Sequence, residues 1–174
     1  AITMVGNIFT AHHVPAWYRF IVLSPIGSHR IDGISVVGNT FKIFDSANIE
    51  RVEAVNTAKG SFDMAETRYL RFSDNSFSKV SQRTESPTTV AVDRTTVATS
   101  WQRVVSGLMP FDGQVLGIDG ITPVGAIRNS SDAIRYVPPY VDTPTGASGQ
   151  SFTVRWPEAV KGKLHVRVRC DQTS

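Results

Sequence analysis

The chain has 174 residues, a net charge of +3, a sequence pI of about 9.3 and one cysteine, Cys170. A lone cysteine excludes an internal disulfide and a cysteine-based zinc site. The sequence has no run of five or more basic residues, which argues against a nucleic-acid-binding arm and a polybasic membrane patch. No apolar run reaches the length of about 18 residues that spans a membrane. We therefore expect no direct nucleic-acid contact and no membrane insertion.

The composition predicts an all-β protein. Charged residues make up only 19% of the chain, and 13 Gly and 9 Pro supply many turns. Val, Ile, Thr and Phe are plentiful, and these residues suit a pleated sheet. We predict an antiparallel β-sandwich or jelly-roll-like barrel with at most one short helix. Residues 1–174 are expected to form a single domain, excised from a longer chain.

In the N-terminal half, the first strand is predicted at residues 2–10. Residues 17–23 form the most apolar run, so we expect a central strand that is buried on both faces. Residues 34–37 and 40–44 flank Gly38-Asn39, a pair typical of a two-residue hairpin turn. No repeat of fixed period is evident. This half is therefore interpreted as a series of short antiparallel strands.

In the C-terminal half, strands are predicted at residues 88–93 and 97–108, and residues 129–136 are the only plausible helix. The last strand, residues 163–170, alternates strictly between apolar and polar side chains, as does the run before it, residues 151–156. The six residues 157–162 between them can reverse the chain. We interpret residues 151–170 as a β-hairpin that closes the sandwich.

One face of this hairpin is basic. Its side chains are Arg155, Lys163, His165, Arg167 and Arg169. They could pair with Asp or Glu residues on neighbouring strands. Alternatively, they could form an anion-binding surface for a sulfated glycan, RNA or an acidic partner, with an affinity that falls as salt rises.

The aromatic residues suggest a second candidate surface. Trp17, Trp101 and Trp156 lie inside apolar runs and are expected in the core. Tyr136 and Tyr140 flank Pro138-Pro139 in a loop and are expected to be exposed. The candidate binding residues are therefore Tyr136, Tyr140, Arg155, Lys163, His165, Arg167 and Arg169.

Signals for catalysis, metal or cofactor binding are weak. Adjacent strand residues such as His12 and His13 point to opposite faces, so solvent-facing histidines are expected rather than a metal site, with a pH-sensing role as a further hypothesis. There is no G-x-S-x-G elbow and no phosphate-binding loop. Cys170 lies on the apolar face of the last strand, where a thiol is usually inert. We expect no enzymatic activity, no cofactor and no metal.

Two stretches carry a family resemblance. Ser86 to Ser106 is rich in Thr, Val and Ser, and Asp142 to Gly149 reads D-T-P-T-G-A-S-G. In the amino-acid composition of these stretches the chain resembles the projecting domains of small icosahedral RNA-virus capsid proteins of the nodavirus, tetravirus and tombusvirus group. The resemblance implies a β-sandwich on the virion surface. It also implies self-association as a dimer or trimer and attachment to a host cell-surface receptor or glycan.

Two other functions remain open. One is a carbohydrate-binding β-sandwich from an enzyme or a phage tail, which predicts saturable sugar binding through exposed aromatic residues. The other is a small β-rich hydrolase, which predicts a His–Asp–Ser cluster or a carboxylate pair in a cleft.

Overall fold

The computed structural model describes residues 1–172, and its regular structure is almost entirely β-strand. The all-β class is confirmed, and the presence of several sheets is consistent with a sandwich. The only helical segments in the described residues are the short 3-10 turns η1 (Met64–Glu66) and η2 (Pro110–Asp112). The helix expected at residues 129–136 is absent. The Asn129 Oδ1 atom instead accepts hydrogen bonds from the backbone N–H groups of Ser131 and Ala133, which holds a tight loop.

The strands fall into two groups along the chain. The N-terminal group is β1 (Ile2–Val5), β2 (Ile8–His12), β3 (Ile21–Leu23), β4 (Gly27–His29), β5 (Asp32–Val37), β6 (Thr40–Phe44), β7 (Glu53–Val55), β8 (Gly60–Phe62), β9 (Arg68–Ser73) and β10 (Ser76–Ser78). The C-terminal group is β11 (Thr88–Val104), β12 (Gly117–Pro123), β13 (Tyr140–Thr145) and β14 (Ser151–Arg169).

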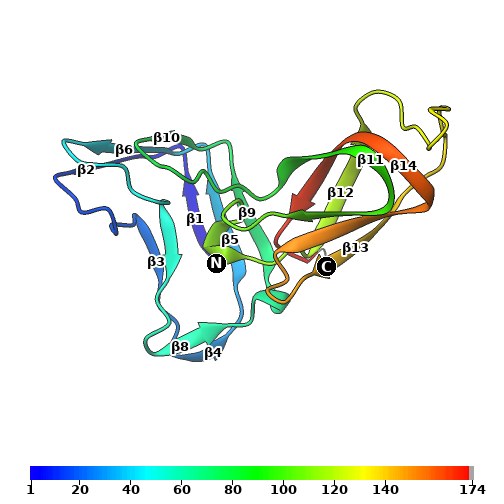
Figure 1. The fold of residues 1–174 in the computed structure, drawn as a ribbon. Coiled ribbons are helices and arrows are strands. Elements are labelled where there is room, and N and C mark those ends of the chain that lie inside the picture. Colours follow the sequence, from blue (N-terminus) through cyan, green and yellow to red (C-terminus); the bar gives the residue numbers. More distant parts are fainter. Residues whose placement is uncertain (173–174) are drawn as a thin grey trace.

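The N-terminal strands form a parallel β-solenoid (Figure 1). β5 lies between β1 and β9, β6 lies between β2 and β10, and β3 and β4 pair with β7 and β8; every one of these pairs is parallel. Each strand thus pairs with its counterpart one coil later and not with the next strand in sequence. We call residues 2–29 coil 1, residues 32–62 coil 2 and residues 68–80 coil 3.

The antiparallel hairpin expected around Gly38-Asn39 is therefore wrong. β5 and β6 flank this pair but belong to different sheets, because the turn is a corner of the solenoid. Gly6, Gly38 and Asp74 occupy equivalent corners with φ of 67°, 65° and 59°. The left-handed conformation that favours Gly-Asn in a hairpin also suits a solenoid corner, so the dipeptide does not distinguish the two.

A ladder of asparagines joins the corners. The Asn39 side chain accepts a hydrogen bond from the backbone N–H of Asn7 at 2.9 Å and donates one to the Met4 carbonyl at 2.9 Å. The Asn75 side chain accepts from the Asn39 backbone N–H at 2.9 Å and donates to the Val36 carbonyl at 2.9 Å. Asn39 and Asn75 are buried. These amides satisfy backbone groups that the corner removes from the strand ladders.

Two residues after each asparagine, phenylalanines stack in a column. The rings of Phe9 and Phe41 lie 5.1 Å apart with an interplanar angle of 10°, and those of Phe41 and Phe77 lie 5.8 Å apart at 11°. The sequence thus carries Asn-x-Phe three times, with asparagines 32 and then 36 residues apart. This is the repeat that the sequence interpretation missed, since its period is not constant.

The C-terminal strands form an antiparallel sheet around β14. β14 pairs with β11 along most of its length, and its other edge pairs with β13 near its start and with β12 near its end. The predicted hairpin at residues 151–170 is therefore wrong. Residues 157–162 do not reverse the chain, because β11 runs alongside both halves of β14 and the two strands curl together through register shifts near Ala98 (Figure 1). β11 is likewise one continuous strand, in a region where two strands were predicted at residues 88–93 and 97–108.

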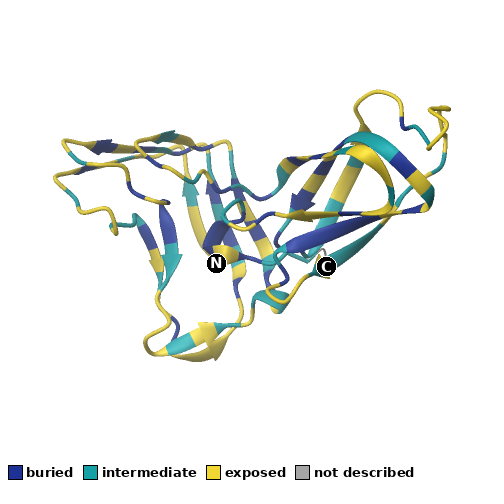
Figure 2. Ribbon diagram, in the orientation of Figure 1, coloured by how far each residue is buried: buried dark blue, intermediate teal, exposed yellow. Residues whose placement is uncertain are grey.

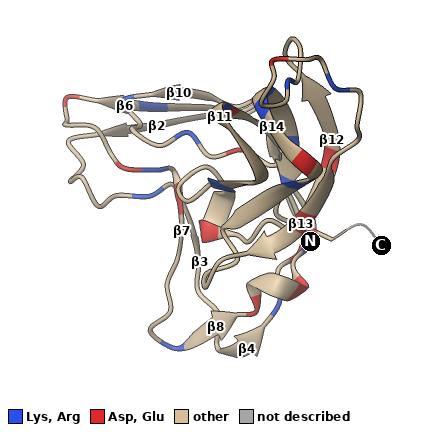
Figure 3. Cartoon of the chain, turned by 45° about the vertical axis from the view of Figure 1, so that its right-hand side comes forward, with Lys and Arg blue, Asp and Glu red and all other residues tan. Residues whose placement is uncertain are grey.

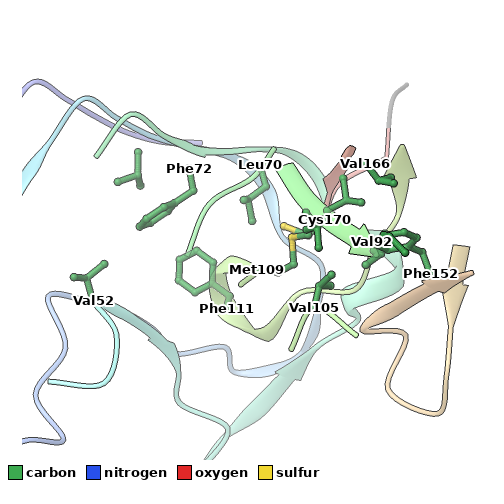
Figure 4. Packing of buried hydrophobic residues seen from close by; sticks show 14 of the residues in the cluster. Val52, Leu70, Phe72, Val92, Val105, Met109, Phe111, Phe152, Val166 and Cys170 are labelled. Carbon is green, nitrogen blue, oxygen red and sulfur yellow. The ribbon is translucent and has the colours of Figure 1, made fainter. Parts of the chain in front are cut away.

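One hydrophobic core spans both parts of the chain. Leu70 of β9 lies near Cys170 and Met109, whereas Phe72 of β9 packs edge-on against Phe111, with ring centroids 6.4 Å apart (Figure 4). Ser86 also pairs with Phe72 through two backbone hydrogen bonds of 2.9 and 3.0 Å. The C-terminal sheet therefore covers the coil 3 end of the solenoid.

Coil 1, at the opposite end, is mostly exposed or half-buried (Figure 2). The expectation of a central strand at residues 17–23 is wrong, because only Ile21–Leu23 is strand and Trp17 is 78% exposed. Trp101 and Trp156 are buried, as predicted.

We predict that Asn39→Ala lowers the free energy of unfolding by about 2–3 kcal/mol, because buried backbone groups in two coils lose their partners. Asn7→Ala, at the exposed end of the same ladder, should cost less than about 1 kcal/mol. Urea denaturation of both variants measures the difference. Equal losses would show that burial of the amide does not set its contribution.

Candidate functional site

The predicted basic residues of β14 lie outside its buried face, but the three arginines among them are paired with carboxylates. Leu164, Val166 and Val168 are fully buried, so the side chains of alternating residues face outward. Arg167 Nε lies 3.9 Å and Arg169 Nε 3.4 Å from the carboxylate of Asp119 on β12. Both signs of charge occur around β12 and β14 (Figure 3). This arrangement matches cross-strand pairing rather than a free cationic surface.

The other residues of this face are dispersed along the curved strand. Lys163 is opposite Asp93 in the β11 register, and His165 is exposed between Ala91 and Thr122. Arg155, near the other end of β14, forms an ion pair with Asp142 of β13. This hydrogen bond from Arg155 lowers the pKa of Asp142. The structure thus does not gather the five predicted basic residues into one site.

A polar groove of about 730 Å³ lies where the solenoid meets the antiparallel sheet. Its charged residues come from both parts: Arg71, Asp74, Glu85, Asp119, Arg167, Arg169 and Asp171. Arg169 extends across Gly117, where any Cβ would collide with the guanidinium nitrogen. This position brings Arg169 Nε within 3.9 Å of Asp171 as well as close to Asp119. The groove's charges are therefore largely held by one another.

Asp171 is the most perturbed acid of this groove. Burial raises its pKa, and the positive charge of Arg169 opposes that shift. Its Oδ2 atom also accepts a hydrogen bond from the Leu70 N–H at 3.2 Å, which links the C-terminal sheet to β9. Because both its oxygens already have protein partners, a role in joining the two parts accounts for Asp171.

An apolar groove of about 520 Å³ lies beside the 124–139 loop. Its lining is aromatic and aliphatic: Pro123, Gly125, Ala126, Ile127, Ile134, Arg135, Tyr136, Val137, Pro138, Pro139 and Trp156. Tyr136 is 91% exposed, as predicted. Backbone hydrogen bonds from Arg128 to Lys161 and from Arg135 to Ile127 anchor the loop to the sheet. The loop therefore presents an exposed ring beside a formed hollow.

Trp156 connects this groove to the core. Its ring packs against Trp101 with centroids 5.1 Å apart, and only 6% of the residue is exposed. Trp101 donates its indole N–H to the Ala98 carbonyl at 3.1 Å. The Trp156 indole N–H is buried and has no hydrogen-bond partner among residues 1–172. A buried donor without a partner is costly.

Tyr140, the other predicted aromatic, is also exposed but lies at the start of β13, outside the groove's lining. It is opposite Arg155 in the β14 register. Tyr136 and Tyr140 therefore do not form one platform.

The histidines lie apart. His12 stacks on Phe44 at 4.8 Å and lies 3.5 Å from Asp45, whereas His29 is 2.7 Å from the Ile26 carbonyl oxygen. His12, His13 and His29 are exposed. Among the described residues, no three His, Cys, Asp or Glu side chains cluster as metal ligands.

Glu53 is the titratable group that sequence reasoning missed. It is fully buried in β7, and its pKa is raised to about 7, chiefly by burial. Thr84 and the charge of Arg51 oppose the shift, although the Thr84 hydroxyl forms no well-aligned hydrogen bond. The sequence alone gives no sign that Glu53 is buried. In the structure, Glu53 lies opposite the buried Ile21 in the parallel β3–β7 pair. Burial likewise raises the pKa of Cys170 to about 12, as expected for an inert thiol.

No protein-family model matches this chain, and no curated protein matches its sequence. No helix in residues 1–172 is long and apolar enough to cross a membrane.

We predict that Arg169→Gln lowers the free energy of unfolding by about 1–2 kcal/mol, because it leaves Asp119 and Asp171 without their shared cation. Arg167→Gln, which removes a more exposed pair, should cost less than about 0.5 kcal/mol. Urea denaturation of both variants at low and high salt measures these two losses of unfolding free energy. A larger loss for Arg167→Gln would contradict the assigned pairing.

We also predict that Glu53 makes stability depend on pH. Because its folded pKa of about 7 lies above the unfolded value, the folded state binds the extra proton, and stability falls as pH rises through that window. The wild type should lose about 2–3 kcal/mol between pH 5 and pH 8 through this group.

Glu53→Gln should remove this loss and be the more stable protein at pH 8. The matched control is Glu66→Gln, at an exposed position on η1, which should leave the pH profile unchanged. Urea denaturation at both pH values measures the effect. A profile unaltered by Glu53→Gln would assign the pH dependence to other groups.

Proposed function

We propose that this chain is a carbohydrate-binding attachment module on the surface of a viral or phage particle and not an enzyme. The observation that carries this proposal is the apolar groove beside the exposed Tyr136, which is lined by proline, aliphatic and aromatic residues. The ligand in this proposal is a glycan on a host cell-surface receptor.

The groove's chemistry suits a sugar. A pyranose ring has an apolar C–H face that packs on flat aromatic and proline surfaces, and its rim carries hydroxyl groups. Tyr136, Pro138 and Pro139 supply flat surfaces on the exposed side of the groove. Ligand sites of this kind are mostly apolar, with a few polar groups that fix orientation.

The charged groups favour binding over catalysis. Arg135, in the groove lining, bonds Glu158 at 2.6 Å, so this carboxylate is already paired. In the polar groove, the Asp119 and Asp171 carboxylates lie within 3.4 and 3.9 Å of Arg169. A general acid or base must reach a reacting proton, and these carboxylates are engaged with arginines. No catalytic residue is therefore assigned.

The solenoid supports an attachment role rather than a shell-forming one. Stacked coils extend along one axis, which suits a module that holds a binding loop away from its point of anchorage. The resemblance to capsid projecting domains implied a β-sandwich, and the parallel coils of the N-terminal half are not part of such a sandwich. We therefore favour the attachment function that both virus-related hypotheses share.

We predict that a glycan screen identifies a ligand, and that Tyr136→Ala raises its dissociation constant by about tenfold through lost stacking. Trp156→Phe should weaken binding severalfold while keeping an apolar ring in the core. Tyr140→Ala is the matched control, because this tyrosine is exposed but lies outside the groove. Titration calorimetry measures all three variants. Equal weakening by Tyr140→Ala would move the site to β13, and absence of any bound glycan would refute a sugar ligand.

A further inference from the structure

The carboxylate of Glu53 is enclosed at the junction between the solenoid and the C-terminal half of the chain. Glu53 is 0% exposed in β7, and β7 packs against η2. Neither carboxylate oxygen has a hydrogen-bond partner among residues 1–172. The Thr84 hydroxyl and the Phe111 backbone N–H lie near enough to favour the ionised form, but neither forms a well-aligned bond. Ionisation therefore creates a buried charge that the closed junction does not satisfy.

The charged and titratable groups near Glu53 come from coil 2, from η2 and from the residues after β14: Glu50, Arg51, Asp112, Cys170 and Asp171. The nearest cation, Arg51, donates to Asp112 at 2.6 Å and not to Glu53. Burial raises the pKa of Glu53 to about 7 against the opposing charge of Arg51. Burial also raises the pKa of Cys170 to about 12, and the charges of Asp171 and Glu53 add to that shift. The cations and carboxylates around Glu53 thus leave its own charge uncompensated.

The η2 turn that packs on β7 has a strained backbone. Phe111 and Asp112 have φ of 57° and 55°, a left-handed conformation that is unfavourable for residues other than glycine. Two contacts hold the turn in place. The buried Phe111 ring packs edge-on against Phe72 (Figure 4), and Asp112 pairs with Arg51. This turn is therefore the part of the junction that a charge on Glu53 displaces most readily.

We propose that Glu53 and η2 form a proton-dependent latch between coil 2 and the C-terminal half of the chain. The latch is closed while Glu53 is protonated. When Glu53 loses its proton, η2 moves away from β7 and the carboxylate reaches water, while the solenoid and the antiparallel sheet stay folded. The closed state binds the extra proton, so the latch is tightest below the ordinary pKa of a glutamate and loosens as pH rises to about 7 and above. None of its residues lines the apolar groove, so the latch does not depend on glycan binding.

Cys170 can report the opening of this latch. It is 0% exposed, and its Cβ and Sγ atoms lie 2.8 and 3.1 Å from where a Cβ on Gly113, the residue after η2, would stand. Movement of η2 therefore uncovers the thiol. Because the chain has one cysteine, dithiodipyridine labels a single site. The labelling rate of the folded protein, divided at each pH by the rate of the urea-unfolded protein, measures the open fraction.

Between pH 6 and pH 8 this normalised labelling rate should rise about tenfold in the wild type, because Glu53 in the open state has the ordinary pKa of a glutamate. Glu53→Gln should label slowly at both pH values. Asp112→Asn removes the ion pair with Arg51 but keeps the titrating group, so it should label faster at both pH values and retain the tenfold rise. The matched control, Glu66→Gln on η1, should behave as the wild type.

Hydrogen exchange distinguishes this local opening from global unfolding. After correction for intrinsic rates, the amides of residues 111–113 should exchange faster at pH 8 than at pH 6, whereas those of β11 and β14 should remain protected. A wild-type labelling rate that does not change with pH would overturn the proposal. So would a rise that persists in Glu53→Gln, or a loss of protection in β11 and β14 together with η2. The wild-type measurements decide the first and last of these outcomes without any variant.

Discussion

The asparagine ladder at the solenoid corners is the constraint on which the rest of the structure depends. Asn39 and Asn75 each bridge two coils through buried side-chain amides, so they fix how far one coil is rotated and shifted against the next. That register places Phe41 over Phe77 in the column and Ile34 over Leu70 in the neighbouring sheet. A buried amide has several hydrogen bonds to satisfy and few ways to satisfy them. Coil 3, placed in this way, supplies the surface against which the antiparallel sheet packs.

The two grooves differ in the chemistry of the residues that line them. The polar groove is the larger, but its arginines and carboxylates neutralise one another across the junction between solenoid and sheet. Such a groove adds specificity to the way the two parts fit. The apolar groove is smaller and has the exposed Tyr136 in its lining. An exposed aromatic ring beside an apolar hollow, rather than groove size or charge density, distinguishes the candidate ligand site from a structural seam.

The structural features that depend on local sequence pattern were predicted correctly. Composition indicated the all-β class, alternation identified the buried face of residues 163–170, and the prolines beside Tyr136 and Tyr140 marked an exposed loop. Pairing could not be predicted in the same way. Gly38-Asn39 suits both a hairpin and a solenoid corner, and Pro157 to Gly162 suits both a reversal and a bend within β14. The basic face of β14 was visible in the sequence, but its partner Asp119 lies on another strand, and the groove around Trp156 is assembled from distant segments.

The position of β14 in the chain has a consequence for the order of assembly. β11, β12 and β13 all take β14 as their partner, and no two of these three strands pair with each other among the described residues. As the chain emerges during synthesis, coils 1 to 3 can stack on one another in turn, since each needs only its predecessor. The antiparallel strands cannot form their sheet until residues 151–169 are available. During that interval β11, with 17 residues of unpaired edge, is the segment most open to association with other chains.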